Sequence, residues 1–218
     1  MQTFKIPEFE EYTAGSVYCI GRNYAEHARE LNNPVPDEPV VFLKPRSSLV
    51  FGNGKLELPM QSGDVHHEVE MVLLVGKQGK KVPASDAVQM IRAVAVGIDF
   101  TARDLQQKAK EKRHPWSVSK GFDTFAPVGK FIPFETIDNP ADLYLELSIN
   151  NNIRQQGNTK EMLFPVDKII EHLTSVFTLY PGDLVFTGTP EGVGKVQKGD
   201  HIKAKLGNQL STLEIDVS

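Results

Sequence analysis

The sequence has 218 residues, of which 40% are hydrophobic and 24% are charged, and its formal net charge is -4. A chain of this length and composition is expected to form a single globular domain spanning 1–218, and its negative charge offers no basic footprint for nucleic acid. The longest apolar runs are far shorter than the roughly 20 residues that cross a bilayer, so we expect no membrane partner.

The N-terminal residues and the cysteine content indicate a cellular compartment. Residues 1–15, expected to form an N-terminal extension, lack the basic-then-apolar pattern of a signal peptide. Cys19 is the only cysteine, which excludes an internal disulfide and suits a reducing compartment. We therefore expect a cytoplasmic protein, with Cys19 as a buried structural thiol in an apolar strand.

The first regular elements expected are a short buried strand at 17–20 and a helix after it. The helix should begin near Tyr24, with Asn23 as N-cap and Glu26 at the capping-box position. Three prolines at 34–39 then exclude regular structure and predict an exposed loop. Segment 22–39 is therefore a candidate for a lid.

Most of the remaining chain has the pattern of strands. Apolar runs and alternations predict strands at 40–43, 55–58, 65–75, 93–100, 143–150, 153–156, 184–187, 201–206 and 213–217. Helical spacing predicts helices at 85–91, 103–112 and 166–176. The sequence therefore predicts a mixed α+β fold that is rich in strands.

Three acidic residues lie within or beside the most apolar strands. Glu68 and Glu70 are two apart in strand 65–75, so both carboxylates should project from one face, and Asp99 can supply a third oxygen. The apolar flanks place these charges in a cavity rather than on an exposed strand face, which is the alternative. Three carboxylates suit a hard divalent ion such as Mg²⁺ or Mn²⁺. His66 has the same parity, so a mixed site for Zn²⁺ or Fe²⁺ stays open.

Further candidate groups lie outside this cluster. His27 and Glu30 form an i, i+3 helical pair, in which the carboxylate would raise the basicity of the imidazole, unless the pair is an incidental surface contact. The glycine-rich segment 187–195 fails the spacing of a phosphate loop. It predicts a turn that presents amides and the Thr189 hydroxyl to a small anion, or a plain connection. Lys120 lies among apolar and small residues, where partial burial would suit it to bind an oxyanion.

Four segments occur in a characteristic order. They are His-His-Glu-Val-Glu at 66–70, Asp-Phe-Thr-Ala-Arg-Asp at 99–104, Pro-Trp at 115–116 before Lys120, and Thr-Gly-Thr-Pro-Glu-Gly-Val-Gly at 187–194. Together they resemble the fumarylacetoacetate hydrolase family, above all its small one-domain acylpyruvate hydrolase and oxaloacetate decarboxylase members. The resemblance runs from about residue 17 to the C-terminus.

The resemblance implies a strand-rich mixed β-sandwich roll with a few short helices, usually a homodimer. It implies that Mg²⁺ or Mn²⁺ is bound by the residues at the metal positions, which are Glu68, Glu70 and Asp99. His27 and Glu30 match the water-activating dyad of the family. The positions that match residues holding a small 2-oxo acid substrate are Arg22, Arg103, Gln106, Lys120 and Thr189.

These features lead to a functional hypothesis. We expect a divalent-metal-dependent hydrolase that cleaves the C–C bond of 3-acylpyruvates to pyruvate and a carboxylic acid, with His27, Glu30 and Lys120 as catalytic residues. Oxaloacetate decarboxylation would form the same enolate at the same site. The alternatives are an isomerase, tautomerase or decarboxylase of 2-oxo or unsaturated dicarboxylates, and a non-catalytic protein that binds metal or oxo acids.

Overall fold

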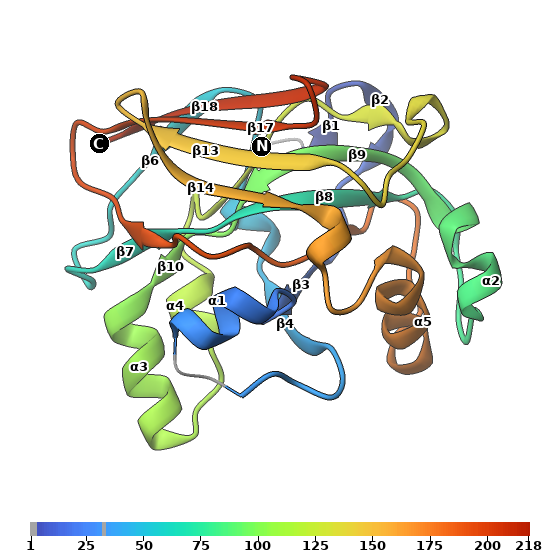
Figure 1. Ribbon diagram of the computed structural model, residues 1–218, viewed down its shortest axis with the longest axis horizontal. Helices are drawn as coiled ribbons and strands as arrows, with labels where there is room; N and C mark the ends of the chain where they lie inside the picture. The colour runs from blue at the N-terminus through green and yellow to red at the C-terminus, as the bar shows by residue number, and fades with distance from the viewer. Residues whose placement is uncertain (1–3, 32–33) are drawn as a thin grey trace.

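A computed structural model describes residues 4–31 and 34–218, and it shows a larger and a smaller β-sheet stacked on each other (Figure 1). The larger, mixed sheet has the strand order β4 (Val40–Lys44), β3 (Val17–Gly21), β15 (Leu184–Phe186), β8 (Val69–Val75), β9 (Ile91–Ile98), β11 (Ala126–Val128) and β5 (Leu49–Phe51), with β12 (Ile132–Pro133) beside β9. The smaller sheet has the order β14 (Asn152–Asn158), β13 (Tyr144–Ile149), β17 (His201–Leu206), β18 (Ser211–Val217) and β6 (Gly54–Leu56).

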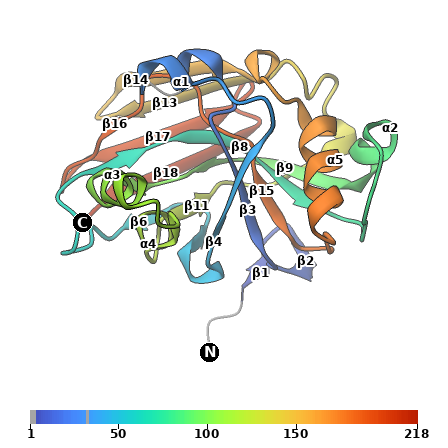
Figure 2. The same cartoon turned by 90° about the horizontal axis from the view of Figure 1, so that it is seen from below.

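Short elements surround this sandwich. A three-stranded sheet and an N-terminal hairpin add the strands β10 (Thr101–Ala102), β7 (Val65–His67), β16 (Gly194–Lys195), β1 (Lys5–Ile6) and β2 (Phe9–Thr13). The helices are α1 (Ala25–Glu30), α2 (Ala84–Ala87), α3 (Arg103–Lys112), α4 (Ser117–Lys120) and α5 (Val166–Val176), and single 3₁₀ turns lie at 46–48, 88–90, 134–136 and 159–161. In Figure 2, α1, α3 and α4 lie around one end of the larger sheet and α2 and α5 around the other. The predicted mixed, strand-rich fold is confirmed.

Strand β8 is buried on both faces, as its unbroken apolar sequence predicts. Met71 and Leu73 pack into a core shared with the smaller sheet, whereas Val72 and Leu74 pack into a second core that includes the N-terminal hairpin. Each of these side chains is fully buried and contributes about 1.5–3 kcal/mol of hydrophobic stabilisation. The strand that carries the acidic residues is therefore held rigidly from both sides.

The pairing of β8 with β9 brings the acidic residues together. The two strands are antiparallel, with Val69 opposite Ile98, so the start of β8 and the end of β9 meet at the same end of the sheet. Asp99 directly follows β9, and its backbone N–H donates to the Glu68 carbonyl at 2.8 Å. Residues that are about thirty positions apart in the sequence thus become neighbours.

Three predicted elements differ in the structure. The predicted strand 65–75 forms two strands, β7 and β8, because the strand conformation is interrupted at Glu68. The predicted helix 85–91 is the four-residue α2 followed by a 3₁₀ turn, since Ile91 already belongs to β9. The N-cap of α1 is Tyr24 without a side-chain cap bond, so the predicted capping by Asn23 is wrong.

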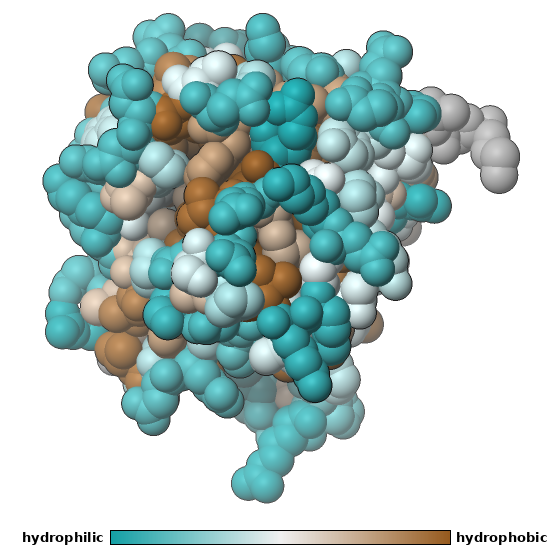
Figure 3. All heavy atoms as spheres, turned by 90° about the vertical axis from the view of Figure 1, so that its right-hand side faces the viewer, coloured by the Kyte–Doolittle hydropathy of each residue, from teal (hydrophilic) through white to brown (hydrophobic). Residues whose placement is uncertain are grey.

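Helices α2 and α5 leave an apolar groove at the other end of the sandwich. Its lining includes Val88, Phe134, Met162 and Val166, and brown side chains gather on this side of the molecule in Figure 3. In the described residues, none of the helices has the length and apolar character needed to traverse a bilayer. Of the candidate lid 22–39, residues 32 and 33 lie outside the described residues. Residues 34–39 contain no helix or strand, and β4 begins directly after them at Val40.

Candidate active site

Three buried carboxylates form the floor of a pocket at the end of the larger sheet. Glu68, Glu70 and Asp99 are 5%, 2% and 0% exposed, and one ligand atom from each lies within 4.8 Å of the others. Among residues 4–31 and 34–218, this is the only cluster of its kind. The oxygen donors and their spacing fit a hard divalent cation.

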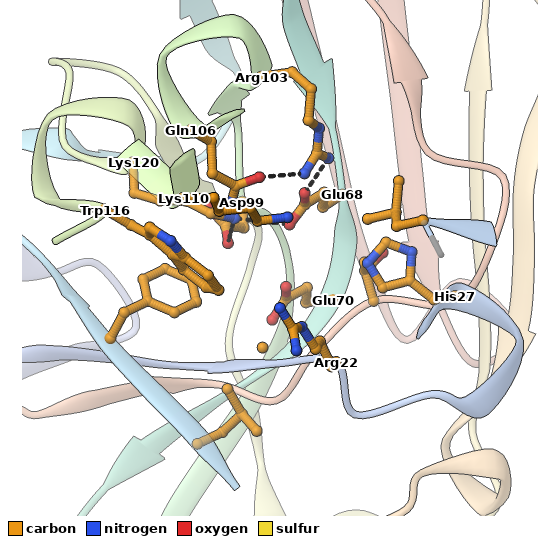
Figure 4. Close-up of a pocket in the computed structure, with 15 residues that line it drawn as sticks. Arg22, His27, Glu68, Glu70, Asp99, Arg103, Gln106, Lys110, Trp116 and Lys120 are labelled. Atoms are coloured by element: carbon orange, nitrogen blue, oxygen red, sulfur yellow. Dashed lines mark hydrogen bonds and ion pairs between the residues drawn. The ribbon is translucent and has the colours of Figure 1, made fainter. Parts of the chain in front are cut away.

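Three cations surround two of these carboxylates. Lys120 Nζ donates to Glu68 Oε2 at 2.8 Å and to Asp99 Oδ2 at 2.5 Å. Arg103 donates to Glu68 Oε1 at 2.5 Å, and its other terminal nitrogen bonds the Gln106 side chain (Figure 4). Lys44 Nζ lies 2.7 Å from Asp99 Oδ1, although that oxygen accepts no hydrogen bond of good geometry within the described chain. The predicted partly buried Lys120 is therefore fully buried and paired with two acids.

The surroundings shift the pKa values of Glu68 and Glu70 in opposite directions. Burial would raise the pKa of Glu68, but the charges of Lys120 and Arg103 outweigh it and hold this pKa well below its usual range. For Glu70, burial and then the nearby charge of Asp99 raise the pKa well above its usual range. Glu70 accepts a hydrogen bond from the Gly188 N–H at 2.7 Å, and no cation of the described chain lies within 4.0 Å of it. No cation of the described chain thus directly contacts Glu70, and a divalent ion held by the cluster would supply one.

The predicted helical pair faces the same pocket from α1. His27 Nδ1 lies 3.3 Å from Glu30 Oε2, and His27 is 5% exposed. Glu30 Oε1 also accepts from the Gly192 N–H at 3.0 Å, so the glycine-rich loop anchors the pair. Burial lowers the pKa of His27 despite the opposing effects of Glu68 and Glu30, which leaves the imidazole neutral near pH 7. A neutral, oriented imidazole can accept a proton.

The pocket brings together all the predicted site residues except Glu30, which supports His27 from behind. Its lining includes Arg22, His27, Glu68, Glu70, Asp99, Arg103, Gln106, Lys120 and Thr189, together with Lys110 and Trp116, which were not predicted. In Figure 4, His27 and Trp116 lie on opposite sides of the carboxylates, and Arg22 lies beside Glu70. A small molecule in this pocket would contact both sides at once.

Two supporting residues were not predicted either. Lys44 ends strand β4, is 3% exposed and donates to the carbonyls at positions 100, 120 and 125, which fixes it beside Asp99. Gln155 is 1% exposed and bonds both neighbours of Glu68, together with the loop that carries Thr189. For Lys44, the only sequence signal of a role in the site is a lysine at the end of an apolar run, and this signal is weak. For Gln155 the sequence contains no such signal.

Two alternatives from the sequence are not supported. His66 pairs with Asp64 at 3.1 Å and is not part of the acidic cluster, so the structure does not form the mixed histidine and carboxylate site. The amides of Gly188 and Gly192 bind protein carboxylates rather than facing an anion, although Thr189 does line the pocket. Cys19 is buried, as expected.

Comparison with known proteins shows to which family a chain with this site belongs. Residues 16–218 match the family described as Fumarylacetoacetate (FAA) hydrolase C-terminal. The chain belongs to the fumarylacetoacetate hydrolase family. Within that family it is 42% identical over 206 residues to an oxaloacetate decarboxylase, mitochondrial, of Dictyostelium discoideum, covering 94% of each chain. It is 46% identical over 201 residues to an oxaloacetate tautomerase, mitochondrial, of Arabidopsis thaliana, covering 92% of this chain and 90% of the relative.

A solved structure of the fumarylacetoacetate hydrolase family extends the comparison. The crystal structure of fumarylpyruvate hydrolase from Pseudomonas aeruginosa in complex with Mn²⁺ and pyruvate has a TM-score of 0.90 and 36% identity, over 94% of this chain and 90% of that chain. These relatives are enzymes named for hydrolysis, decarboxylation and tautomerisation, and one holds a divalent metal. Because two of them are mitochondrial, the cytoplasmic location stays a prediction.

Proposed function

We propose that this protein is a divalent-metal-dependent hydrolase that cleaves 3-acylpyruvates to pyruvate and a carboxylic acid, and that it also converts oxaloacetate. The observation that carries the proposal is the buried His27, braced by Glu30 at 3.3 Å and lining the same pocket as the acidic cluster. Hydrolysis needs a base that activates water, whereas decarboxylation has no evident need for one.

The acidic cluster supports a metal-dependent reaction. Glu68, Glu70 and Asp99 would hold Mg²⁺ or Mn²⁺, which when bound supplies Lewis-acid polarisation of the substrate's 2-oxo group. Arg103, Gln106 and Thr189 line the pocket and would orient the carboxylate of the 2-oxo acid. This arrangement supports a small 2-oxo acid as substrate.

The chain's own groups account for the proton and charge transfers. His27 removes a proton from water, and the resulting hydroxide attacks the distal carbonyl carbon of the 3-acylpyruvate. The bond between that carbon and C3 then breaks, and its electron pair forms the enolate of pyruvate. The Lys120 ammonium, fully buried in the pocket, stabilises the enolate oxygen. The proton that His27 took from water is returned to C3, which gives pyruvate and a carboxylic acid and restores the neutral imidazole.

The second candidate function is tautomerisation or decarboxylation of oxaloacetate as the main activity. Its support is the identity of 42% and 46% to relatives with those names. Decarboxylation needs only enolate stabilisation, so it would depend on the carboxylates and Lys120 rather than on His27, whereas tautomerisation also needs a base that takes the C3 proton. The two functions therefore make different demands on the same pocket.

The experiment follows the loss of acetylpyruvate and of oxaloacetate by ultraviolet absorbance, using EDTA-treated protein with and without added Mg²⁺ or Mn²⁺. Metal should restore acetylpyruvate cleavage. His27→Ala should lower that cleavage by about 10²- to 10⁴-fold and affect the decarboxylation of oxaloacetate far less. His172→Ala, on the distant helix α5, is the matched control. An equal loss of both activities in His27→Ala would contradict the separate hydrolytic role.

A further inference from the structure

Strand β4 presents two side chains to the candidate active site. Phe42 and Lys44 are two apart in this strand, so they project from the same face, whereas Leu43 between them is 47% exposed. Phe42 lines the pocket, and Lys44 Nζ lies 2.7 Å from Asp99 Oδ1. Every residue of β4 pairs with a residue of β3, which holds the strand in place within the larger sheet. Strand β4 is therefore part of the site.

The ring of Phe42 lies against the ammonium group of Lys120. Lys120 Nζ is 4.7 Å from the centroid of this ring, which is a cation–π distance. A lysine ammonium has three N–H donors, and Lys120 donates to Glu68 at 2.8 Å and to Asp99 at 2.5 Å. An aromatic face next to the ammonium attracts its charge but takes the place of water. The ring therefore shields the ammonium from water and leaves its third donor for a ligand.

Further contacts hold Phe42 and Lys120 together. The Trp116 ring packs edge-on against Phe42 at 5.7 Å, and the Trp116 carbonyl accepts from the Lys120 backbone N–H at 3.1 Å. Lys44 Nζ donates to the Lys120 carbonyl at 2.5 Å. In Figure 4, Trp116 and Lys120 lie on the same side of the carboxylates. Strand β4 thus contacts Lys120 at its ammonium through Phe42 and at its backbone through Lys44.

This arrangement affects how the pocket stabilises a negative charge that forms during the reaction. In the proposed reaction the charge forms on the enolate oxygen, and a donor that already points toward this oxygen stabilises it best. If water solvated the Lys120 ammonium, that water would have to reorganise as the enolate forms, and part of the stabilisation would be lost. A hydrocarbon ring in place of the water removes this cost, while its π face still stabilises the positive charge.

We propose that Phe42 is a positioning residue for Lys120, whose ring keeps water from the ammonium and directs it toward the oxygen that becomes negatively charged. The inference rests on the proposed function in taking a pyruvate enolate as the species that Lys120 stabilises. Because Phe42 acts through Lys120, its loss should weaken the binding of a ligand with a negative charge at this oxygen far more than that of a ligand without one. The expected size is that of a cation–π contact in a desolvated site, roughly 5- to 30-fold in affinity.

The test compares oxalate with oxamate, which are close in size and shape but differ in the charge at one end. That end is a negatively charged carboxylate in oxalate, as in an enolate, and an uncharged amide in oxamate. Dissociation constants are measured by titration calorimetry on the Mg²⁺-loaded protein. In Phe42→Leu, the preference for oxalate over oxamate should fall roughly 5- to 30-fold relative to the wild type. Phe42→Tyr keeps the aromatic ring and should retain the preference.

Controls separate this role from a purely structural one. Phe51→Leu is the matched variant, because Phe51 is a partly buried phenylalanine of β5 at the opposite edge of the same sheet, and it should leave the preference unchanged. Mn²⁺ affinity, measured by electron paramagnetic resonance without either ligand, should be the same in Phe42→Leu as in the wild type. Phe42→Met provides the same comparison if Phe42→Leu does not fold. An unchanged preference in Phe42→Leu, or an equal weakening of both ligands, would overturn the positioning role.

Neither ligand is hydrolysed, so the binding result does not depend on the proposed hydrolysis. A protein that shows the Phe42-dependent preference but cleaves no acetylpyruvate would refute the proposed hydrolysis and keep the positioning role. Cleavage of acetylpyruvate together with a preference that Phe42→Leu leaves unchanged would refute the positioning role and keep the proposed function.

Discussion

Replacement of Gln155 by leucine tests how the site is supported from below. Its Oε1 accepts from the Val69 N–H at 3.0 Å and pairs with His67 Nδ1 at 2.8 Å. Its Nε2 donates to Thr189 Oγ1 at 2.8 Å and to the Pro190 carbonyl at 2.9 Å. The amide thus uses its full hydrogen-bonding capacity while 1% exposed, and Gln155→Leu keeps a similar volume but removes all four contacts.

The magnitude follows from the partners that remain. The Val69 N–H and the Pro190 carbonyl belong to the backbone and cannot turn away, and each buried group left unpaired costs about 1–3 kcal/mol. The side chains of His67 and Thr189 can rotate toward other partners. The more apolar leucine side chain regains about 1 kcal/mol through its burial. When this gain is subtracted from the loss, the free energy of unfolding should fall by about 3 kcal/mol.

Urea unfolding measures this difference, and Gln156→Leu is its control, because Gln156 is the exposed neighbour on the same strand. The control should stay within about 0.5 kcal/mol of the wild type. Since Glu68 lies between His67 and Val69, Gln155→Leu should also weaken Mn²⁺ binding, measured by electron paramagnetic resonance. A loss below about 1 kcal/mol, or one equal to that of the control, would refute the reasoning.

Three further outcomes are expected. Lys44→Met leaves Asp99 with one fewer cation and three carbonyls without their donor. The free energy of unfolding, measured in urea, should fall by about 3–5 kcal/mol, whereas Lys55→Met, at an exposed lysine, should not lower it in this way. The fully buried Asn23 side chain makes three hydrogen bonds, two with the backbone of Phe164 and one to the carbonyl of Thr187. Asn23→Ala removes them and should cost about 2–4 kcal/mol by the same measurement, and a neutral result would show that these bonds do not stabilise the fold. Because burial lowers the pKa of His27, the rate of acetylpyruvate hydrolysis should decline only as the pH falls below about 6.5, and a decline already complete at pH 7 would be inconsistent with a neutral base.

Sequence periodicity was sufficient for the elements that bury their side chains regularly. The run at 71–75 is apolar without interruption, and the structure buries every residue of it. The asparagines at 150 and 151 both adopt positive φ between β13 and β14, as a two-residue hairpin requires. The acidic positions could be predicted for the same reason, because charges next to strands buried on both faces must find a cation or a cavity.

The features that the sequence did not predict depend on contacts between segments that are far apart in the chain. Asn23 has the residue type and spacing of an N-cap, yet it bonds the carbonyls at 164 and 187 from segments more than 140 positions away, which no local pattern reveals. Ile153 and Gln155 should share a face of β14, but an irregularity in its pairing with β13 leaves Ile153 53% exposed and Gln155 buried. A bulge re-aims one side chain without changing the composition of the strand.

The placement of the two functional groups explains how one pocket could serve reactions with different names. The carboxylates, Lys44 and Lys120 belong to the paired strands and the segments packed on them, and enolate stabilisation requires only this rigid part. His27 instead comes from α1, a helix of six residues that reaches the glycine-rich loop through Glu30. His27 and the acidic cluster are thus held by separate parts of the fold, so a change at one need not disturb the other.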